Sequence, residues 1–332
     1  MATAALAAFG AAAERLPLVW PTPNRAFLEG KPEADYVQPT SSGRLESGLY
    51  GCTRNGGRRF HEGIDLKATT RDRNRRATDP VFAAMPGRVV HVHRTAGNSS
   101  YGIYVVLAHD YDGVAFYSLY AHLASVDEDA RLGRRLEQGD VLGVMGNTAG
   151  GYVIPRSRAH LHFELGLRLA DDFRPWFDRQ GFGSRNRHGD WNGMNLVGWN
   201  PLEFYRLSLE GKIDGPRDYL LGSPAAVRVR VADQGIPGLA RRAPGLVEGD
   251  PAAPRAGWDV EFSAYGVPLR FRPVSPAAMG DAPPPAEIRA HDPDLAFPPC
   301  RDLLDGSDGA YRPGSDLRRA LELIFGSERI GR

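Results

Sequence analysis

Short runs of apolar residues, each ended by turn residues, recur through the first two thirds of the chain. Three of these runs lie at residues 79–95, 101–123 and 139–151, with turns at Met85-Pro86-Gly87, at 110–113 and at the closing glycines. Residues 159–169 (AHLHFELGLRL) alternate between apolar and polar side chains, as a half-buried strand does. Short strands at this spacing predict an antiparallel, mainly β unit.

The last third of the chain shows the same pattern on a smaller scale. Residues 227–233 (VRVRVAD) predict a strand, and residues 258–274 predict a hairpin that turns at Tyr265-Gly266. Residues 315–326 have apolar side chains at helical spacing, and Ser315 is placed to cap that helix. We therefore expect a smaller, β-rich C-terminal domain that ends in a helix.

Chain length and composition divide the protein further. A chain of 332 residues has room for two domains. We expect a lead of loops at 1–44, a main domain at 45–207 with a polar, glycine-rich insertion at 170–198, and an accessory domain at 208–332. The small apolar residues that end at Ala11-Ala12-Ala13 suit a signal-peptidase site but lack a basic segment before them, so a short helix is an equal alternative.

Composition and charge exclude several functional classes. Hydrophobic residues make up 42% and charged residues 24%, which is typical of globular proteins, and no apolar stretch reaches the roughly 20 residues of a membrane span. A net charge of +1 argues against a nonspecific nucleic-acid binder. Seven arginines and one lysine between Arg54 and Arg76 could hold an anionic polymer or form a solvated loop. Cys52 and Cys300 could form one disulfide or remain two separate thiols.

Candidate chemistry begins in residues 60–68 (FHEGIDLKA). His61 and Asp65 would lie about 13 Å apart in a fully extended strand, so sharing one ion requires a bend, for which Gly63 offers the freedom. A helix of the HExxH type would also bring positions i and i+4 together. Gly63 and the β-branched Ile64 disfavour that helix, and the second histidine is missing, so we reject it.

Histidine pairs in two strands could complete a site with His61 and Asp65. In a strand, residues i and i+2 share a face, so both imidazoles of His160-Leu161-His162 face one cleft. Two imidazoles and a carboxylate around an ion leave a fourth position open, which is the catalytic form of a zinc site. His91 and His93 have the same spacing in an equally good strand, and spacing alone does not choose between the two pairs.

Several motifs in a fixed order resemble one family of peptidases. HEGIDL (61–66), YAHL (120–123) and AHLHFEL (159–165) are separated by PGRVV (86–90) and GDVLGVMGNTAG (139–150). Together these motifs are similar to the LytM or lysostaphin type of zinc peptidase, family M23, over roughly residues 45–204. The resemblance implies an antiparallel, two-sheet fold of the barrel-sandwich type for this part of the chain.

The resemblance also implies a role for each residue of these motifs. One Zn²⁺ ion would bind His61, Asp65 and His162, and His122 and His160 would assist catalysis. His91 and His93 would then belong to the scaffold, and His109 would be structural. His188 and His291 lie outside the motifs, where we expect them to be exposed. Arg54 is a weaker candidate for holding the scissile carbonyl, and Glu62 is expected to point away from the face shared by His61 and Asp65.

The resemblance implies a substrate as well, namely the peptide cross-links of bacterial peptidoglycan, cut in the periplasm or outside the cell. The segments 69–80 and 170–198 are unusual for the family, which leaves the preferred bond open. An alternative is a non-catalytic LytM-like module that activates a cell-wall amidase, although such relatives typically lose zinc ligands that are all present here. The part from about residue 212 would bind the wall or a partner, or would stabilise the catalytic sheet.

Overall fold

A computed structural model describes residues 15–250, 252–279, 287–307 and 310–330. The alanines at 11–13, considered above as a signal-peptidase site, and the proline-rich segment at 282–285 lie outside these ranges. The described residues have a mainly β architecture with two larger antiparallel sheets of unequal size and two two-stranded ladders, which confirms the predicted fold class. Among the helices of the described residues, none has the length and apolar character that a membrane crossing requires.

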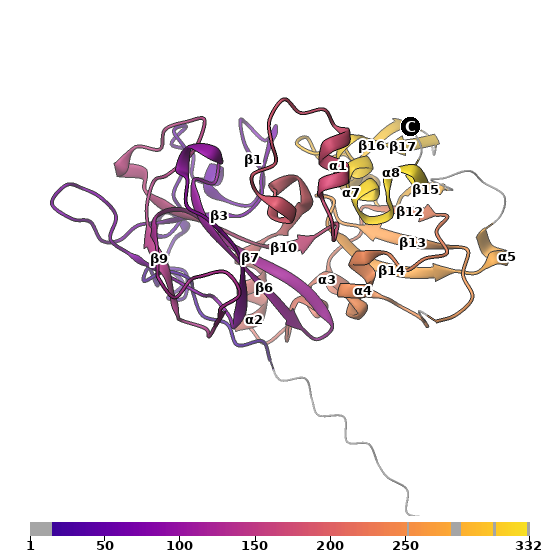
Figure 1. Cartoon of the computed structure of the whole chain (residues 1–332), viewed down its shortest axis with the longest axis horizontal. Coiled ribbons are helices and arrows are strands. Elements are labelled where there is room, and N and C mark those ends of the chain that lie inside the picture. The colour runs from indigo at the N-terminus through magenta and orange to yellow at the C-terminus, as the bar shows by residue number, and fades with distance from the viewer. Residues whose placement is uncertain (1–14, 251, 280–286, 308–309, 331–332) are drawn as a thin grey trace, which may run out of the picture.

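A nine-stranded antiparallel sheet forms the first part of the chain (violet to magenta in Figure 1). Its strands are β3 (Ile64–Lys67), β4 (Pro80–Phe82), β5 (Gly87–His93), β6 (Ile103–Tyr111), β7 (Val114–Val126), β8 (Arg135–Leu136), β9 (Val141–Met145), β10 (His160–Arg168) and β11 (Leu196–Trp199). The order β11-β10-β7-β6-β5-β8 forms the main path, while β3 pairs with β10, and β9 joins β4 to β7. A separate two-stranded ladder pairs β1 (Gly51–Arg54) with β2 (Arg59–His61).

Strand β10 organises the sheet because it pairs with three other strands. Its first half lies against β3, its middle against β7 and its last residues against β11. Every side chain from His160 to Leu167 is buried, so β10 faces protein on both sides. The register places His162 opposite Asp65 on one neighbour and opposite Ala121 on the other, so the three sequence motifs lie side by side.

A four-stranded antiparallel sheet and several short helices make up the rest of the chain (orange to yellow in Figure 1). The sheet consists of β12 (Val227–Val231), β13 (Gly257–Phe262), β14 (Pro268–Val274) and β15 (Glu287–Ala290), and β16 (Leu304–Ser307) pairs with β17 (Ala310–Pro313). The helices are α1 (Arg174–Arg179), α2 (Pro201–Leu209), α3 (Pro216–Gly222), α4 (Gly238–Arg242), α5 (Pro276–Met279), α6 (Pro293–Ala296), α7 (Ser315–Phe325) and α8 (Ser327–Ile330). The hairpin β13–β14 turns at Tyr265-Gly266, as predicted.

The terminal helix differs from its prediction at one residue. Leu317, Leu321 and Ile324 are buried, which confirms the predicted apolar face of α7. The predicted cap is wrong, because Gly314 is the N-cap residue and Ser315 is already the first residue of the helix. The side chain of Asp302 accepts a hydrogen bond from the backbone N–H of Ser315 instead. A partner distant in sequence thus replaces the local cap.

The C-terminal part is attached to the large sheet by covalent and noncovalent contacts. Cys52 and Cys300 form a disulfide with their Cα atoms 5.4 Å apart, so the alternative of two separate thiols is wrong. The Arg301 guanidinium lies 3.8 Å from the ring centroid of Phe60. Trp176 of α1 donates a hydrogen bond to Glu322 of α7 at 2.8 Å, and these two helices lie next to each other in Figure 1. The division at residue 207 stays a prediction.

A buried histidine in the large sheet leads to a prediction about pH. His109 donates from Nδ1 to the carbonyl of Pro86 at 2.7 Å and accepts at Nε2 from Ser118 at 2.8 Å. Burial lowers the pKa of His109 from 6.5 to about 4. Between these values the unfolded chain binds a proton that the folded chain does not. The free energy of unfolding should therefore fall as pH falls through this window, by about 3 kcal/mol for this residue.

Urea unfolding measured at intervals from pH 7.5 to pH 4.5 tests this prediction. His109→Gln keeps a polar side chain but removes the titrating group, so its stability should change less steeply with pH than that of the wild type. Equal slopes in the two proteins would show that His109 does not carry the effect.

Candidate metal centre

The HEGID segment bends between two strands. Strand β2 ends at His61 and β3 begins at Ile64, and His61 Nε2 lies 3.1 Å from Asp65 Oδ1, so the predicted bend is confirmed. Gly63 was expected to allow this bend, and the structure gives another reason for a glycine at this position. A Cβ atom at this position would lie 2.2 Å from the carbonyl oxygen of Phe163, so Gly63 is needed for the close approach of β10.

The second histidine of HLH completes the cluster. His162 Nδ1 lies 3.0 Å from His61 Nε2 and 3.0 Å from Asp65 Oδ1. All three side chains are buried, with no more than 4% of any residue exposed. The three residues expected to hold zinc therefore converge at one point, where each offers one atom that could bind an ion.

Hydrogen bonds on the far side of each ring decide which nitrogen faces the cluster. His61 donates from Nδ1 to the carbonyl of Leu49 at 2.8 Å, and His162 donates from Nε2 to Glu164 at 2.8 Å. When both rings are neutral, these bonds leave lone pairs on His61 Nε2 and His162 Nδ1 that face the Asp65 carboxylate. Three acceptor atoms about 3 Å apart repel one another unless they share a proton or a metal cation. Two imidazoles and a carboxylate are a donor set that suits Zn²⁺.

The pKa shifts in the cluster describe its charge when no metal ion is bound. Burial lowers the pKa of His61, which keeps its imidazole neutral. Burial raises the pKa of Asp65, but the neighbouring His61, His160 and Arg54 outweigh it and hold that pKa well below its usual value. Burial lowers the pKa of His162, yet the hydrogen bonds to Asp65 and Glu164 raise it to about 9. A metal ion would displace that proton, as metal binding commonly does.

Two further imidazoles lie beside the cluster. His160 donates from Nδ1 to the carbonyl of Arg158 at 2.7 Å, which leaves its Nε2 3.6 Å from Asp65 Oδ1. His122 donates from Nδ1 to the carbonyl of Thr148 at 2.8 Å, and its ring centroid lies 4.8 Å from that of His160. Burial lowers the pKa of His160 and holds that of His122 well below 6.5. Both rings are therefore neutral at pH 7, with Nε2 able to accept a proton.

The backbone of His122 has an unusual conformation. Its φ angle is 61°, in the left-handed region, which costs a residue other than glycine about 1 to 2 kcal/mol. Its N–H donates to the carbonyl of Tyr101 at 2.9 Å, and the ring bond to Thr148 holds the side chain from the other end. Strained residues of this kind cluster at functional sites because the surrounding structure holds them in place.

Arg54 contacts the cluster through the second oxygen of its carboxylate. Its guanidinium donates to Asp65 Oδ2 at 2.7 Å and, through Nε, to the carbonyl of Ser47 at 3.2 Å. This contact orients the carboxylate so that Oδ1 faces the histidines. Arg54 also lines the cavity described below, and its expected contact with a substrate stays a prediction.

Glu164, which is not among the predicted site residues, lies behind His162. Its buried carboxylate accepts hydrogen bonds from Tyr101 at 2.7 Å, from Tyr117 at 2.8 Å and from His162. Burial raises the pKa of Glu164, but these bonds outweigh burial and lower it, so the group is ionised at neutral pH. The signal was present in the sequence, since Glu164 follows His162 by two residues and shares its strand face.

Replacing Glu164 with glutamine should weaken metal binding without removing a ligand. The change removes the negative charge that makes His162 a stronger donor, and such second-layer changes typically cost about 10- to 100-fold in metal affinity. Competition with a chelator of known affinity measures this quantity. Tyr117→Phe, which removes only one hydrogen bond to Glu164, serves as the control and should have a smaller effect. Unchanged affinity in Glu164→Gln would contradict this role.

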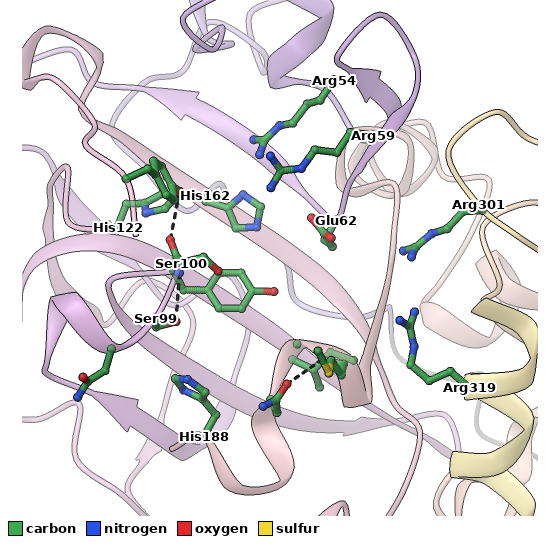
Figure 2. Close-up of a pocket in the computed structure, with 17 residues that line it drawn as sticks. Arg54, Arg59, Glu62, Ser99, Ser100, His122, His162, His188, Arg301 and Arg319 are labelled. Atoms are coloured by element: carbon green, nitrogen blue, oxygen red, sulfur yellow. Dashed lines mark hydrogen bonds between the residues drawn. The ribbon is translucent and has the colours of Figure 1, made fainter. Parts of the chain in front are cut away.

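A cavity of about 440 Å³ opens beside the cluster and is shown in Figure 2. His122 and His162 line it on one side, and four arginines surround it, namely Arg54, Arg59, Arg301 and Arg319. The expectation that His188 is exposed is wrong: the residue is half-buried and lines the cavity, because the 170–198 insertion packs against β5. Glu62 also lines the cavity, and its expected direction away from the face of His61 and Asp65 stays a prediction. His291 is exposed, as expected.

Comparisons with known proteins agree with this site. Residues 59–172 match the model of peptidase family M23. Three solved structures are similar to the chain. The catalytic domain of the antimicrobial peptidase lysostaphin from Staphylococcus simulans is 21% identical with a TM-score of 0.29, covering 48% of this chain and 87% of that domain. Csd3 of Helicobacter pylori is 21% identical with a TM-score of 0.26, and the match covers 39% of this chain and 31% of Csd3. LytU is 26% identical with a TM-score of 0.25, and the match covers 36% of this chain and 74% of LytU.

The similarity to this family rests on the sequence match, because these TM-scores are low. No curated protein matches the chain. The matched residues run from β2 to just beyond β10, so they include His61, Asp65, His122, His160 and His162. Residues 59–172 of the chain are thus similar to peptidase family M23.

Proposed function

We propose that this protein is a zinc-dependent endopeptidase that hydrolyses peptide cross-links of bacterial peptidoglycan. One observation carries the proposal: three lone-pair donors converge beside two neutral, unliganded imidazoles at a cavity. The family match supports the reaction class. The non-catalytic alternative gains no support, because the residues proposed as ligands and as helper histidines are all present.

His61 would hold zinc through Nε2, Asp65 through Oδ1 and His162 through Nδ1. Three protein ligands leave a fourth coordination position free, as catalytic zinc sites do. Zinc bound in such a site acts as a Lewis acid that polarises a peptide carbonyl and activates water at neutral pH. Arg54 and Glu164 hold the carboxylate and one imidazole in the orientation that this binding requires.

His122 and His160 would handle the protons of the reaction. In each ring Nδ1 donates to a backbone carbonyl, so only Nε2 is left to contact a substrate or water. A neutral Nε2 accepts a proton from the attacking water, and the same nitrogen, once protonated, donates to the departing amine. The carboxylate of Asp65, 3.6 Å from His160 Nε2, would stabilise the charged ring between these steps.

The charge around the cavity favours a substrate that carries carboxylates. Four arginines line the cavity against one glutamate. Asp65 pairs with Arg54, and Asp316 pairs with Arg301 and Arg319, so a small excess of positive charge remains at the cavity. Arg301 and Arg319 come from the C-terminal part, which supports a role for that part at the cavity itself. Wall binding by residues 208–332 stays a prediction. The disulfide supports a location in the periplasm or outside the cell.

Digestion of purified sacculi tests the proposal. Sacculi with direct cross-links and sacculi with glycine bridges are incubated with zinc-loaded protein, and the released fragments are identified by mass spectrometry. New amino termini within cross-links are expected, and their masses identify the bond. His160→Asn serves as the inactive control. Release of no fragment from any sacculus would overturn the proposal, and stimulation of a wall amidase by the same preparation would favour the alternative.

A further inference from the structure

A second cluster of histidines lies outside the centre described above. His91 and His93 share one face of β5, and His188, from the insertion, packs against both. The ring centroids of His93 and His188 are 4.9 Å apart, and those of His91 and His93 are 6.2 Å apart. Each residue offers one ring nitrogen within 4.8 Å of the other two. The spacing of His91 and His93 could be seen in the sequence, but the contact of His188 with both residues could not be predicted from it.

Hydrogen bonds leave ring nitrogens of His91 and His93 able to bind an ion. His93 donates from Nε2 to the carbonyl of Thr95 at 3.0 Å, which leaves a lone pair on Nδ1. His188 Nδ1 lies 2.9 Å from the hydroxyl of Tyr104, and the same side chain has a hydrogen bond with the backbone of Asn98, so an ion bound to His188 would replace one of these bonds. His91 Nε2 is buried and forms no hydrogen bond with any residue that the structure describes. An unsatisfied buried nitrogen costs about 1 to 3 kcal/mol, and an ion would satisfy it.

The rings are in the form that binds a metal. Burial, followed by the neighbouring His188 and His93, lowers the pKa of His91 to about 4. Burial also lowers the pKa of His93 and of His188. All three imidazoles are thus neutral at pH 7, and imidazole nitrogens suit zinc, copper and nickel.

Two tyrosines separate this cluster from the first one. The Tyr101 ring lies 5.7 Å from the His162 ring and 5.2 Å from the Tyr104 ring, and Tyr104 lies 5.1 Å from His91. The two clusters share no residue. His188 nevertheless lines the same cavity as His162, and Figure 2 shows it apart from His122 and His162.

We propose that His91, His93 and His188 bind a second Zn²⁺ ion, which ties the 170–198 insertion to β5 at the wall of the cavity. Zinc–nitrogen distances of about 2.0 to 2.1 Å in a tetrahedral site place ligand atoms about 3.4 Å apart, so the rings close slightly around the ion. Three imidazoles leave one position, which water or a carboxylate of a bound peptide can fill. The proposal is independent of the catalytic function proposed above.

Zinc stoichiometry distinguishes the two centres. Full-length protein is stripped with chelator, reloaded with Zn²⁺, desalted and analysed by elemental mass spectrometry. The wild type is expected to retain two ions per chain, and His188→Ala and His162→Gln one each. His291→Ala, which removes an exposed histidine, is the control and should retain two. Equal zinc content in His188→Ala and the wild type would overturn the second site. Two ions in His162→Gln would instead overturn the first.

Trypsin cleavage after the exposed Arg185 and Arg187 tests the tethering role. Zinc should slow this cleavage severalfold in the wild type and in His162→Gln, because opening of the insertion must then release an ion. It should not slow cleavage in His188→Ala or in His91→Ala. Cleavage that is insensitive to zinc in the wild type would overturn the tether.

Discussion

Replacing His162 with alanine should remove one zinc ion and abolish hydrolysis of wall peptides. The residue supplies Nδ1 at the centre of the cluster, 3.0 Å from both other donors. Its loss leaves two ligands, too few for a catalytic site. We expect metal affinity at the centre to fall by more than about a hundredfold. This exceeds the loss expected for Glu164→Gln, which changes a partner of a ligand and not a ligand itself. Zinc per chain and peptide release from sacculi measure the two effects.

His162→Ala also affects the stability of the fold, and this effect must be separated from the loss of a metal ligand. It leaves Glu164 buried without its positively polarised partner, and breaking a buried charged pair costs about 3 to 5 kcal/mol. His162→Gln avoids this cost, because a glutamine amide can donate to Glu164 as Nε2 does while it offers no Nδ1. Zinc loss in a stably folded His162→Gln would therefore report the ligand role alone. Zinc loss of equal size in His160 variants would mean that the roles within HLH are assigned wrongly.

The centre could be predicted from the sequence where it depends on strand geometry. His160 and His162 share a face because a strand has a period of two, and the bend between His61 and Asp65 follows from the need to share an ion. The family resemblance chose between the HLH and HVH pairs, which spacing did not. Glu164 obeys the same period of two, but its other partners are distant in sequence, because Tyr101 lies in the turn before β6 and Tyr117 lies in β7.

The walls of the cavity could not be predicted, because they depend on contacts between distant segments. Cys52 and Cys300 are 248 residues apart, and no local pattern indicates that their pairing brings Arg301 to the cavity. His188 lies in an irregular segment without periodicity, so its approach to β5 was not visible. The left-handed conformation of His122 is likewise imposed by its neighbours, since nothing in the YAHL sequence favours a positive φ.

Replacing His122 or His160 should remove turnover while metal content is preserved. Neither residue contributes an atom to the His61, Asp65 and His162 cluster, so zinc per chain should equal that of the wild type. The loss of a positioned general acid or base typically lowers kcat by about 10² to 10⁴-fold. We expect KM to change much less, because the arginines that line the cavity remain.

Asparagine is the most informative substitution for His122 and for His160. Its side-chain amide can reproduce the Nδ1 hydrogen bonds to Thr148 and Arg158, and it removes only Nε2. At position 122 asparagine also tolerates the left-handed backbone, whereas alanine would add strain. A His122→Asn protein that keeps its zinc and its wild-type kcat would contradict the proton-transfer role. Loss of zinc from His160→Asn would instead place His160 among the ligands, and the ligand set would need revision.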